Sequence, residues 1–195
     1  MLKAYHFLKT DMRSGFGPEA PWEVGEKRTL DKAIKVKLCE FGYHSSPTLW
    51  DALQYALGPV ACLVEISRPV QKDETKSISR SRKLIKAVNI ERGLRLYATD
   101  CAARVLRRLD RKRLNKRELE AVRVARDLAN GRIIADAWEA ARGAGSAAAA
   151  AVVTEIEWQR EHFEQMFGGI FQCGPNRCGP DASPQRQTPR YQLCP

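Results

Sequence analysis

The stretch from residue 38 to residue 66 constrains the fold more than any other part of the chain. It contains a tight turn led by Gly42, a polar edge, one amphipathic segment and one apolar run. The amphipathic segment lies between Thr48 and Leu57, and its apolar residues follow the i, i+3, i+4, i+7 spacing of a helix. Gly58-Pro59 ends this helix, and the apolar run at 60–66 is short enough for a central strand. The sequence therefore predicts a helix that leads into a buried strand.

The polar edge places a phenol, an imidazole and two hydroxyls beside the predicted helix, from Tyr43, His44, Ser45 and Ser46. Backbone N–H groups at a helix N-terminus lack helical partners and favour an anion, which suits a binding site. The same residues suit plain capping, with Ser45 or Ser46 as N-cap and Pro47 at the first helical position. Both interpretations stay open.

Four further features describe the N-terminal part. Residues 2–8 alternate loosely and are rich in aromatic side chains, which favours a strand. Residues 35–39 alternate basic and apolar side chains, as in a half-exposed strand. The Gly- and Pro-rich segment 11–27 predicts a loop anchored by Trp22. Glu65 interrupts the apolar run, where it is either the last inward polar residue or faces solvent.

The pattern from residue 94 to residue 167 is almost entirely helical. Apolar stripes mark two helices, with members at 98, 101, 102, 105 and 109 and then at 119, 122, 125 and 128. Asn130-Gly131 predicts the end of the second helix. A short helix at 133–142 and a long one from 146 to about 167 follow, and the alanine run at 147–151 favours close helix–helix packing, although it also suits a helix surface.

The last segment, 168–195, holds five of the ten prolines and few aliphatic residues, which predicts a disordered tail. We therefore expect three parts: an α+β domain at 1–90, a helical domain at 91–167 and the tail. The longest apolar run, 147–153, is far shorter than the ~20 residues of a membrane span, and no signal peptide is evident. We expect a cytoplasmic protein without membrane contact, in which Cys39, Cys62 and Cys101 are small buried hydrophobes.

Positive charge is concentrated in the first helix and just beyond it. The residues from 104 to 117 include eight Lys or Arg and one acid, in a chain of net charge +10. Arg104, Arg107, Arg108 and Arg111 share one helix face at this spacing. Such a face is either merely solvated or binds nucleic-acid phosphates without sequence preference, since no aromatic residues for base stacking accompany it.

Metal and cofactor motifs are weak. Cys173 and Cys178 form one loose pair, whereas zinc sites prefer two ordered Cys/His pairs, so we expect no metal. The chain has no Gly-rich dinucleotide fingerprint, phosphate-binding loop or zinc-protease motif.

Two resemblances bear on function. The segments Lys3-Ala4-Tyr5-His6-Phe7-Leu8, Pro21-Trp22-Glu23-Val24, Leu38–Ser46, Asp51–Ala56 and Leu63–Ile66 together resemble a domain family common in bacteriophage and prophage proteins. The segments Leu96–Leu106 and Ala125–Gly131 look like the helical domain of immunity proteins from bacterial toxin systems. These resemblances imply an accessory protein of a bacterial cell that binds a host or toxin protein and needs no cofactor.

A more distant similarity carries chemistry. The order of Gly42-Tyr43-His44-Ser45, a helix ending in Tyr55-Ala56, and Leu63–Ile66 is similar to the middle of ADP-ribosyltransferase folds. That similarity implies NAD as cofactor, with His6 at the nicotinamide ribose, Tyr43 stacked on nicotinamide, and His44 and Ser45 lining the pocket. The transferase pattern also needs a glutamate on a later strand. Glu74 and Glu91 lack strand-like surroundings, and Glu65 is the catalytic candidate.

Taken together, these patterns predict an α+β protein with a small mixed N-terminal sheet, a helical C-terminal half and a disordered tail. We expect a non-catalytic protein that binds a protein partner. An ADP-ribosyltransferase-like enzyme is the alternative, and nonspecific nucleic-acid binding through the basic face is a weaker one.

Overall fold

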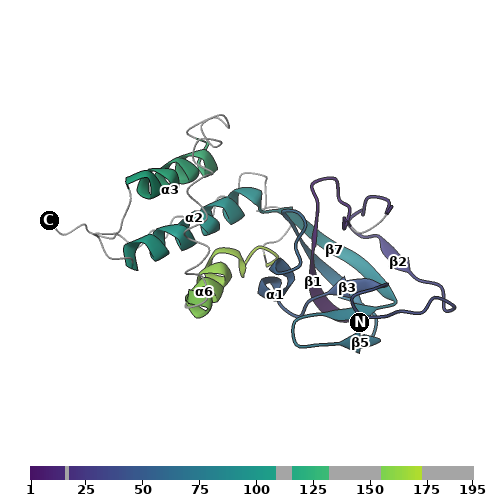
Figure 1. The fold of residues 1–195 in the computed structure, drawn as a ribbon. Helices are drawn as coiled ribbons and strands as arrows, with labels where there is room; N and C mark the ends of the chain where they lie inside the picture. Colours follow the sequence, from purple (N-terminus) through teal and green to yellow (C-terminus); the bar gives the residue numbers. More distant parts are fainter. Residues whose placement is uncertain (16–17, 109–115, 132–154, 173–195) are drawn as a thin grey trace.

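The computed structural model describes residues 1–15, 18–108, 116–131 and 155–172. Its elements form two antiparallel sheets in the N-terminal part and helices after them, so the predicted α+β class is confirmed (Figure 1). The predicted helix at 133–142, the first part of the predicted helix at 146–167 and the tail beyond Gln172 lie outside the described residues.

The larger sheet has four strands in the order β1-β4-β7-β2. These strands are β1 (Leu2–Leu8), β4 (Val60–Ile66), β7 (Ser81–Asn89) and β2 (Lys27–Thr29). The predicted strands at 2–8 and 60–66 are confirmed with those bounds. Strand β4 is central because β1 and β7 pair with its two edges, and Glu65 alone among its residues is not buried.

The smaller sheet has the order β3-β6-β5, from β3 (Tyr43–Ser45), β6 (Ser77–Ser79) and β5 (Gln71–Lys72). Two backbone hydrogen bonds between Tyr5 and Ser46 join it to the edge of β1. The sequence analysis missed β2, β3, β5, β6 and β7. The first four are too short for a periodic signal, whereas the apolar positions Leu84, Ala87 and Val88 of β7 are visible in the sequence.

The predicted strand at 35–39 is wrong. A single bridge between Lys37 and Phe41 closes a tight turn there, and Cys39 at its tip is exposed with φ +65°. A positive φ is incompatible with an extended strand. Gly42 follows with φ +141°, and the side chains of Ile78 and Val36 occupy the space a Cβ would need. Cys39 is therefore not a buried hydrophobe, whereas Cys62 is buried and Cys101 half-buried.

The helix after this turn is shorter than predicted and has a different cap. Helix α1 spans Leu49–Leu53, and the Thr48 hydroxyl accepts the Asp51 backbone N–H at 3.0 Å. Ser45 lies in β3 and Ser46 pairs with Tyr5, so neither caps the helix. Threonine at this position satisfies one of the orphan N–H groups that the predicted serines were expected to satisfy.

Two cores lie on opposite faces of the larger sheet. One face packs Ala4, Leu8, Cys62, Val64 and Leu84 against Trp22 of the 11–27 loop. Trp22 is 2% exposed, so its predicted anchoring role is confirmed. The other face carries Phe7 and Ala61 and is covered by helices.

Three helices form the second half of the described chain: α2 (Glu91–Arg108), α3 (Lys116–Ala129) and α6 (Ile156–Phe167). Helix α3 packs on α2, while α6 returns to the sheet and places Phe163 and Phe167 in the core beside Phe7 (Figure 1). Gly131, with φ +69°, follows α3 at the predicted helix end. The core on the helix-covered face therefore contains residues from both of the predicted parts, 1–90 and 91–167. No helix among the described residues is long and apolar enough to cross a membrane.

The residues just after α6 pack on the core, although the sequence analysis assigned them to the tail. Ile170 and Phe171 contact the helix-side core, and the ring of Phe171 lies 5.9 Å from that of Tyr5. The Lys86 amine donates a hydrogen bond to the Phe171 carbonyl at 2.9 Å. The packed part of the chain therefore extends at least to Phe171.

Candidate functional site

The structure brings two of the predicted site residues to one face of the larger sheet. His6 lies on β1 between Ala4 and Leu8, two positions from each, so its side chain points to the face that carries Trp22. Tyr43, on β3, packs against the same core. The structure therefore places both residues on the side of the larger sheet that carries this core.

Arg82 occupies the space around both residues. Its guanidinium lies 4.5 Å from the centre of the Trp22 ring and 5.3 Å from that of Tyr43, and it donates to the His44 carbonyl at 3.1 Å. Arg82 is 3% exposed and forms no ion pair with a described carboxylate. Burial lowers its pKa to about 10, which still leaves it charged at neutral pH. The aromatic faces stabilise this buried cation.

One ring nitrogen of His6 is inaccessible to solvent. Its Nε2 is buried and has no hydrogen-bond partner among the described residues. Burial lowers the pKa of His6 well below its usual value, and the nearby charges of Arg82 and His44 lower it further. The imidazole is therefore neutral at neutral pH, because burial and the positive charge of Arg82 both disfavour a proton on it.

A second arginine, Arg28, also packs on the ring of Trp22. Arg28 lies 4.1 Å over the Trp22 ring and pairs with Glu26 at 2.6 Å. Trp22 and Tyr43 meet edge to face, with ring centres 5.7 Å apart. We call Trp22, Arg28, Tyr43 and Arg82 the cation–aromatic cluster. The cluster lies on the sheet face to which the His6 side chain points.

His44 and Ser45 hold the small sheet and its turn. The Nε2 of His44 accepts the Cys39 backbone N–H at 3.0 Å, and burial lowers the pKa of this histidine. The hydroxyl of Ser45, which is 3% exposed, lies 3.3 Å from that of Ser77 on the neighbouring strand. Both side chains are engaged in local structure.

Glu65 lies away from these residues. In the β1–β4 ladder Glu65 faces Lys3, whereas His6 faces Cys62 three positions away. Successive side chains alternate between faces, so an odd separation places Glu65 and His6 on opposite sides of the sheet, about 10 Å apart along the strand. The structure does not bring the catalytic candidate to the predicted NAD residues.

The predicted basic face is partly used inside the protein. Arg104 pairs with Glu155, whose side chain is 4% exposed, and lies 4.4 Å over the Trp158 ring. These contacts tie α2 to the start of α6. The side chains of Arg107 and Arg108 and the whole of Arg111 lie outside the described residues.

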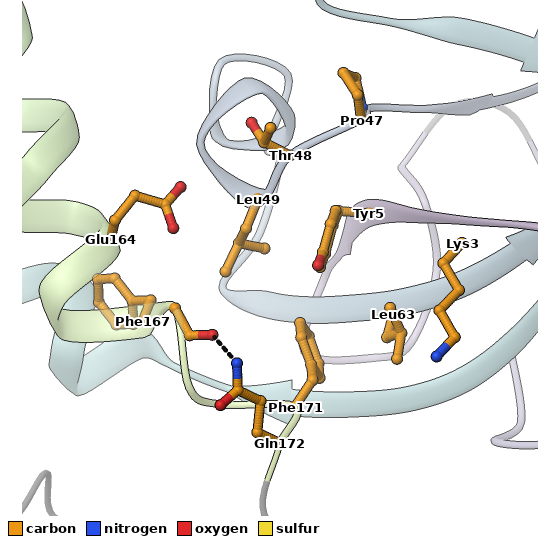
Figure 2. Close-up of a pocket in the computed structure, with 11 residues that line it drawn as sticks. Lys3, Tyr5, Pro47, Thr48, Leu49, Leu63, Glu164, Phe167, Phe171 and Gln172 are labelled. Atoms are coloured by element: carbon orange, nitrogen blue, oxygen red, sulfur yellow. Dashed lines mark hydrogen bonds between the residues drawn. The ribbon is translucent and has the colours of Figure 1, made fainter.

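An open depression of about 340 Å³ lies on the other face, at the β1 edge of the sheet. Its lining comes from β1 and β4 (Lys3, Tyr5, Leu63), from α1 and the residues before it (Pro47, Thr48, Leu49), and from the end of α6 and the residues after it (Glu164, Phe167, Gly168, Phe171, Gln172). Figure 2 shows Leu49, Tyr5 and Phe171 between Glu164 on one side and Lys3 on the other. The depression thus combines an apolar middle with opposite charges at its ends.

Sequence reasoning missed this depression. Its walls come from segments separated by more than a hundred residues, and they meet only because α6 packs on the sheet. The described residues contain no group of three or more His, Cys, Asp or Glu side chains that could hold a metal ion.

The fold and site define an α+β protein with an open depression of mixed polar and apolar lining at a sheet edge. A domain of the family described as "Domain of unknown function (DUF7666)" covers residues 2–95, from the start of β1 into the first turns of α2. The chain has no significant match among curated proteins or among solved structures.

Proposed function

We propose that this chain is a non-catalytic binding protein that takes a protein partner in the depression between β1, α1 and the end of α6. The observation that carries the proposal is the lining itself. Tyr5, Leu49 and Phe171 offer apolar surface, while Lys3 and Glu164 place opposite charges at its ends. A concave surface in which apolar side chains provide contact area and polar groups fix orientation is typical of binding sites.

The other candidate residues support a non-catalytic role. Arg104, His44 and Ser45 are used in tertiary contacts, and Tyr43 packs in the cation–aromatic cluster against Trp22 and Arg82. The partner that we propose is a host or toxin protein, in the phage or prophage setting that the sequence resemblance implied. This setting is part of the proposal.

Site-specific photo-crosslinking tests the proposal. A photoreactive residue at Gln172, which is exposed at the depression, should capture a partner from a bacterial lysate. The same residue at Glu120, exposed on α3, is the matched control and should not. Phe171→Ala should reduce capture at Gln172. Equal capture at both positions, or capture insensitive to Phe171→Ala, would refute the proposed surface.

A second candidate, an ADP-ribosyltransferase-like enzyme that uses NAD, has one observation in its favour. His6 and Tyr43 lie on the same face, and the His6 Nε2 has no partner among the described residues. The test combines calorimetry with NAD and the unfolding of Tyr43→Ala. NAD binding that Tyr43→Ala abolishes at little cost in stability would favour the enzyme. Absence of binding, with a loss of ~3–5 kcal/mol in the variant, would reject it.

A further inference from the structure

We propose that the depression receives an extended segment of the partner, which pairs with the free edge of β1 at Lys3 and inserts a tyrosine side chain that donates to Glu164. This inference rests on the proposed function and names the chemistry of the partner. It follows from the backbone of β1, from the path of the chain at Pro47 and from the side chains of the depression.

The edge of β1 is only partly covered. Tyr5 directs both its N–H and its C=O away from β4, since both bond to Ser46 at 2.9 Å. In an antiparallel ladder the outward-pointing residues alternate, and the β1–β4 register has no bulge, so Lys3 also points its N–H and C=O outward. No described residue pairs with the backbone of Lys3. A free pair of this kind is a template for an added strand.

Pro47 leaves this position open. If the chain continued straight from Ser46 along β1, the residue two positions after Ser46 would pair with Lys3. Instead the chain turns at Pro47 into α1, whose cap is Thr48. The covering strand therefore stops one pair short of Lys3. An added segment can continue the same line.

The face of the sheet determines which side chain enters. A residue paired opposite Lys3 points to the same face as Lys3 and Tyr5, which is the face of the depression. Tyr5 and Phe171, with ring centres 5.9 Å apart, and Leu49 favour a ring there. A basic side chain would lie opposite Lys3 and is disfavoured by like charge, whereas a ring can accept the Lys3 cation on its face.

Glu164 provides the polar end. Its carboxylate is exposed at the wall formed by α6 and makes no ion pair with the described residues. It can accept a hydrogen bond but cannot donate one when ionised. A tyrosine combines the ring that suits the middle of the depression with a hydroxyl that donates to this carboxylate.

The experiment titrates the full-length protein with the blocked peptide Thr-Val-Tyr-Val-Thr and follows backbone amide resonances by NMR. We expect saturable shifts at Lys3, Phe171 and Gln172, and slower hydrogen exchange of the Lys3 N–H. Lys3→Pro removes that N–H at an outward position, where the sheet does not need it, and should abolish binding. Lys3→Ala, which keeps the N–H, is the matched control and should retain most of it.

The tyrosine contact has its own matched pair. Replacing the peptide tyrosine with phenylalanine should weaken binding about threefold to tenfold, the range for loss of one hydrogen bond. In Glu164→Ala the two peptides should bind almost equally. Equal binding of both peptides to the wild type would overturn the tyrosine assignment.

Other outcomes overturn the paired strand. No saturable shift with the wild type, or equal binding by Lys3→Pro and Lys3→Ala, would reject it. A concentration-dependent dimer in sedimentation that Lys3→Pro dissociates would assign the edge to a second copy of the chain. If partner crosslinking at Gln172 persists in Lys3→Pro, the proposed function stands and the paired strand fails. If crosslinking never occurs, the proposed function itself fails.

Discussion

His6 shows how one residue can couple stability to pH. Its Nε2 is sealed from water on the face that also carries Arg82, and His44 lies on the strand above. In the unfolded chain the imidazole titrates near 6.5, whereas in the folded protein its pKa lies well below that value. The folded state therefore binds the proton less tightly than the unfolded state does.

The sign of the resulting effect follows from this difference. Above a pH of about 6.5 both states are neutral and the fold has its full stability, whereas at lower pH only the unfolded chain gains the proton. We expect the free energy of unfolding to fall between about pH 7 and pH 5, measured by urea denaturation. His6→Gln should have a shallower pH dependence. His44→Gln should remove a further part of this pH dependence, since the pKa of His44 is also lowered in the folded protein. Parallel curves for wild type and His6→Gln would contradict the assignment.

Trp22 is the residue on which the loop-side core depends. It is 2% exposed and supports both Arg28 and Arg82 on its ring. Trp22→Ala should lower the free energy of unfolding by ~3–5 kcal/mol, because it empties a packed core position and leaves two cations without their aromatic partner. Val24→Ala, at a residue of the same loop that is 60% exposed, should change it by less than ~0.5 kcal/mol. Chemical denaturation measures both; similar losses would show that the loop does not depend on Trp22.

At the scale of elements, helices α2 and α6 are joined by a chain of ring and ionic contacts. Arg104 of α2 pairs with Glu155 and lies over Trp158, whose ring stacks on His162 at 4.7 Å. His162 in turn lies 3.0 Å from the Asp100 carboxylate on α2. These contacts set the position of α6, and α6 forms one wall of the depression.

Arg104→Gln should therefore act on stability. We expect a loss of about 1–3 kcal/mol, since a charged hydrogen bond to the buried Glu155 is replaced by a weaker neutral one. Arg123→Gln is the matched control on α3, where the side chain is 67% exposed, and should cost less than about 1 kcal/mol. Thermal unfolding of the two variants measures both losses. Equal shifts in melting temperature would mean that the Arg104–Glu155 pair contributes no more to stability than a surface ion pair.

The nucleic-acid hypothesis can be separated from this structural role. Replacement of Arg107, Arg108 and Arg111 with glutamine should weaken binding to any sequence and flatten its salt dependence, if the face contacts phosphates. Filter binding with duplex and single-stranded DNA at low salt measures this. No binding by the wild type would leave only the solvated-face interpretation.

At the scale of the whole molecule, one of the two cores contains residues from both sides of the predicted domain boundary. Phe163 of α6 is fully buried beside Phe7 and Ala61 of the sheet. The family match ends at residue 95, early in α2, whereas the core on the helix side needs α6. The matched region contains only part of the cover of this sheet face, from α1, and the later helices complete it.

Truncation tests how far the packed molecule extends. A chain ending at Gln172 should keep the melting temperature of the full chain, because residues 173–195 have few aliphatic side chains to bury. A chain ending at Phe167 should lose about 2 kcal/mol or more, since Ile170 and Phe171 contact the core and Lys86 bonds to the Phe171 carbonyl. Differential scanning calorimetry measures both. An unchanged melting temperature for the shorter chain would place the boundary at residue 168.

The sequence by itself determined the strands at 2–8 and 60–66, the loop anchored by Trp22 and the end of α3 at Asn130-Gly131. These features depend on local properties: the alternation or continuity of apolar residues, the size of one aromatic side chain, and the freedom of glycine at positive φ. The same local reasoning failed at 35–39, because the turn there needs a positive φ at Cys39, which alternation does not reveal.

Only the tertiary structure decided which residues meet. His6 and Glu65 lie in correctly predicted strands, yet the register of β1 on β4 places them on opposite faces. The sequence predicts Arg104 on a solvated or phosphate-binding face, whereas in the structure it pairs with Glu155 and lies over Trp158. The depression exists because α6 buries Phe163 and Phe167 against the sheet and brings Phe171 to Tyr5. Strand register and helix docking are settled by burial between segments far apart in the chain, and a pattern read along the sequence does not contain that information.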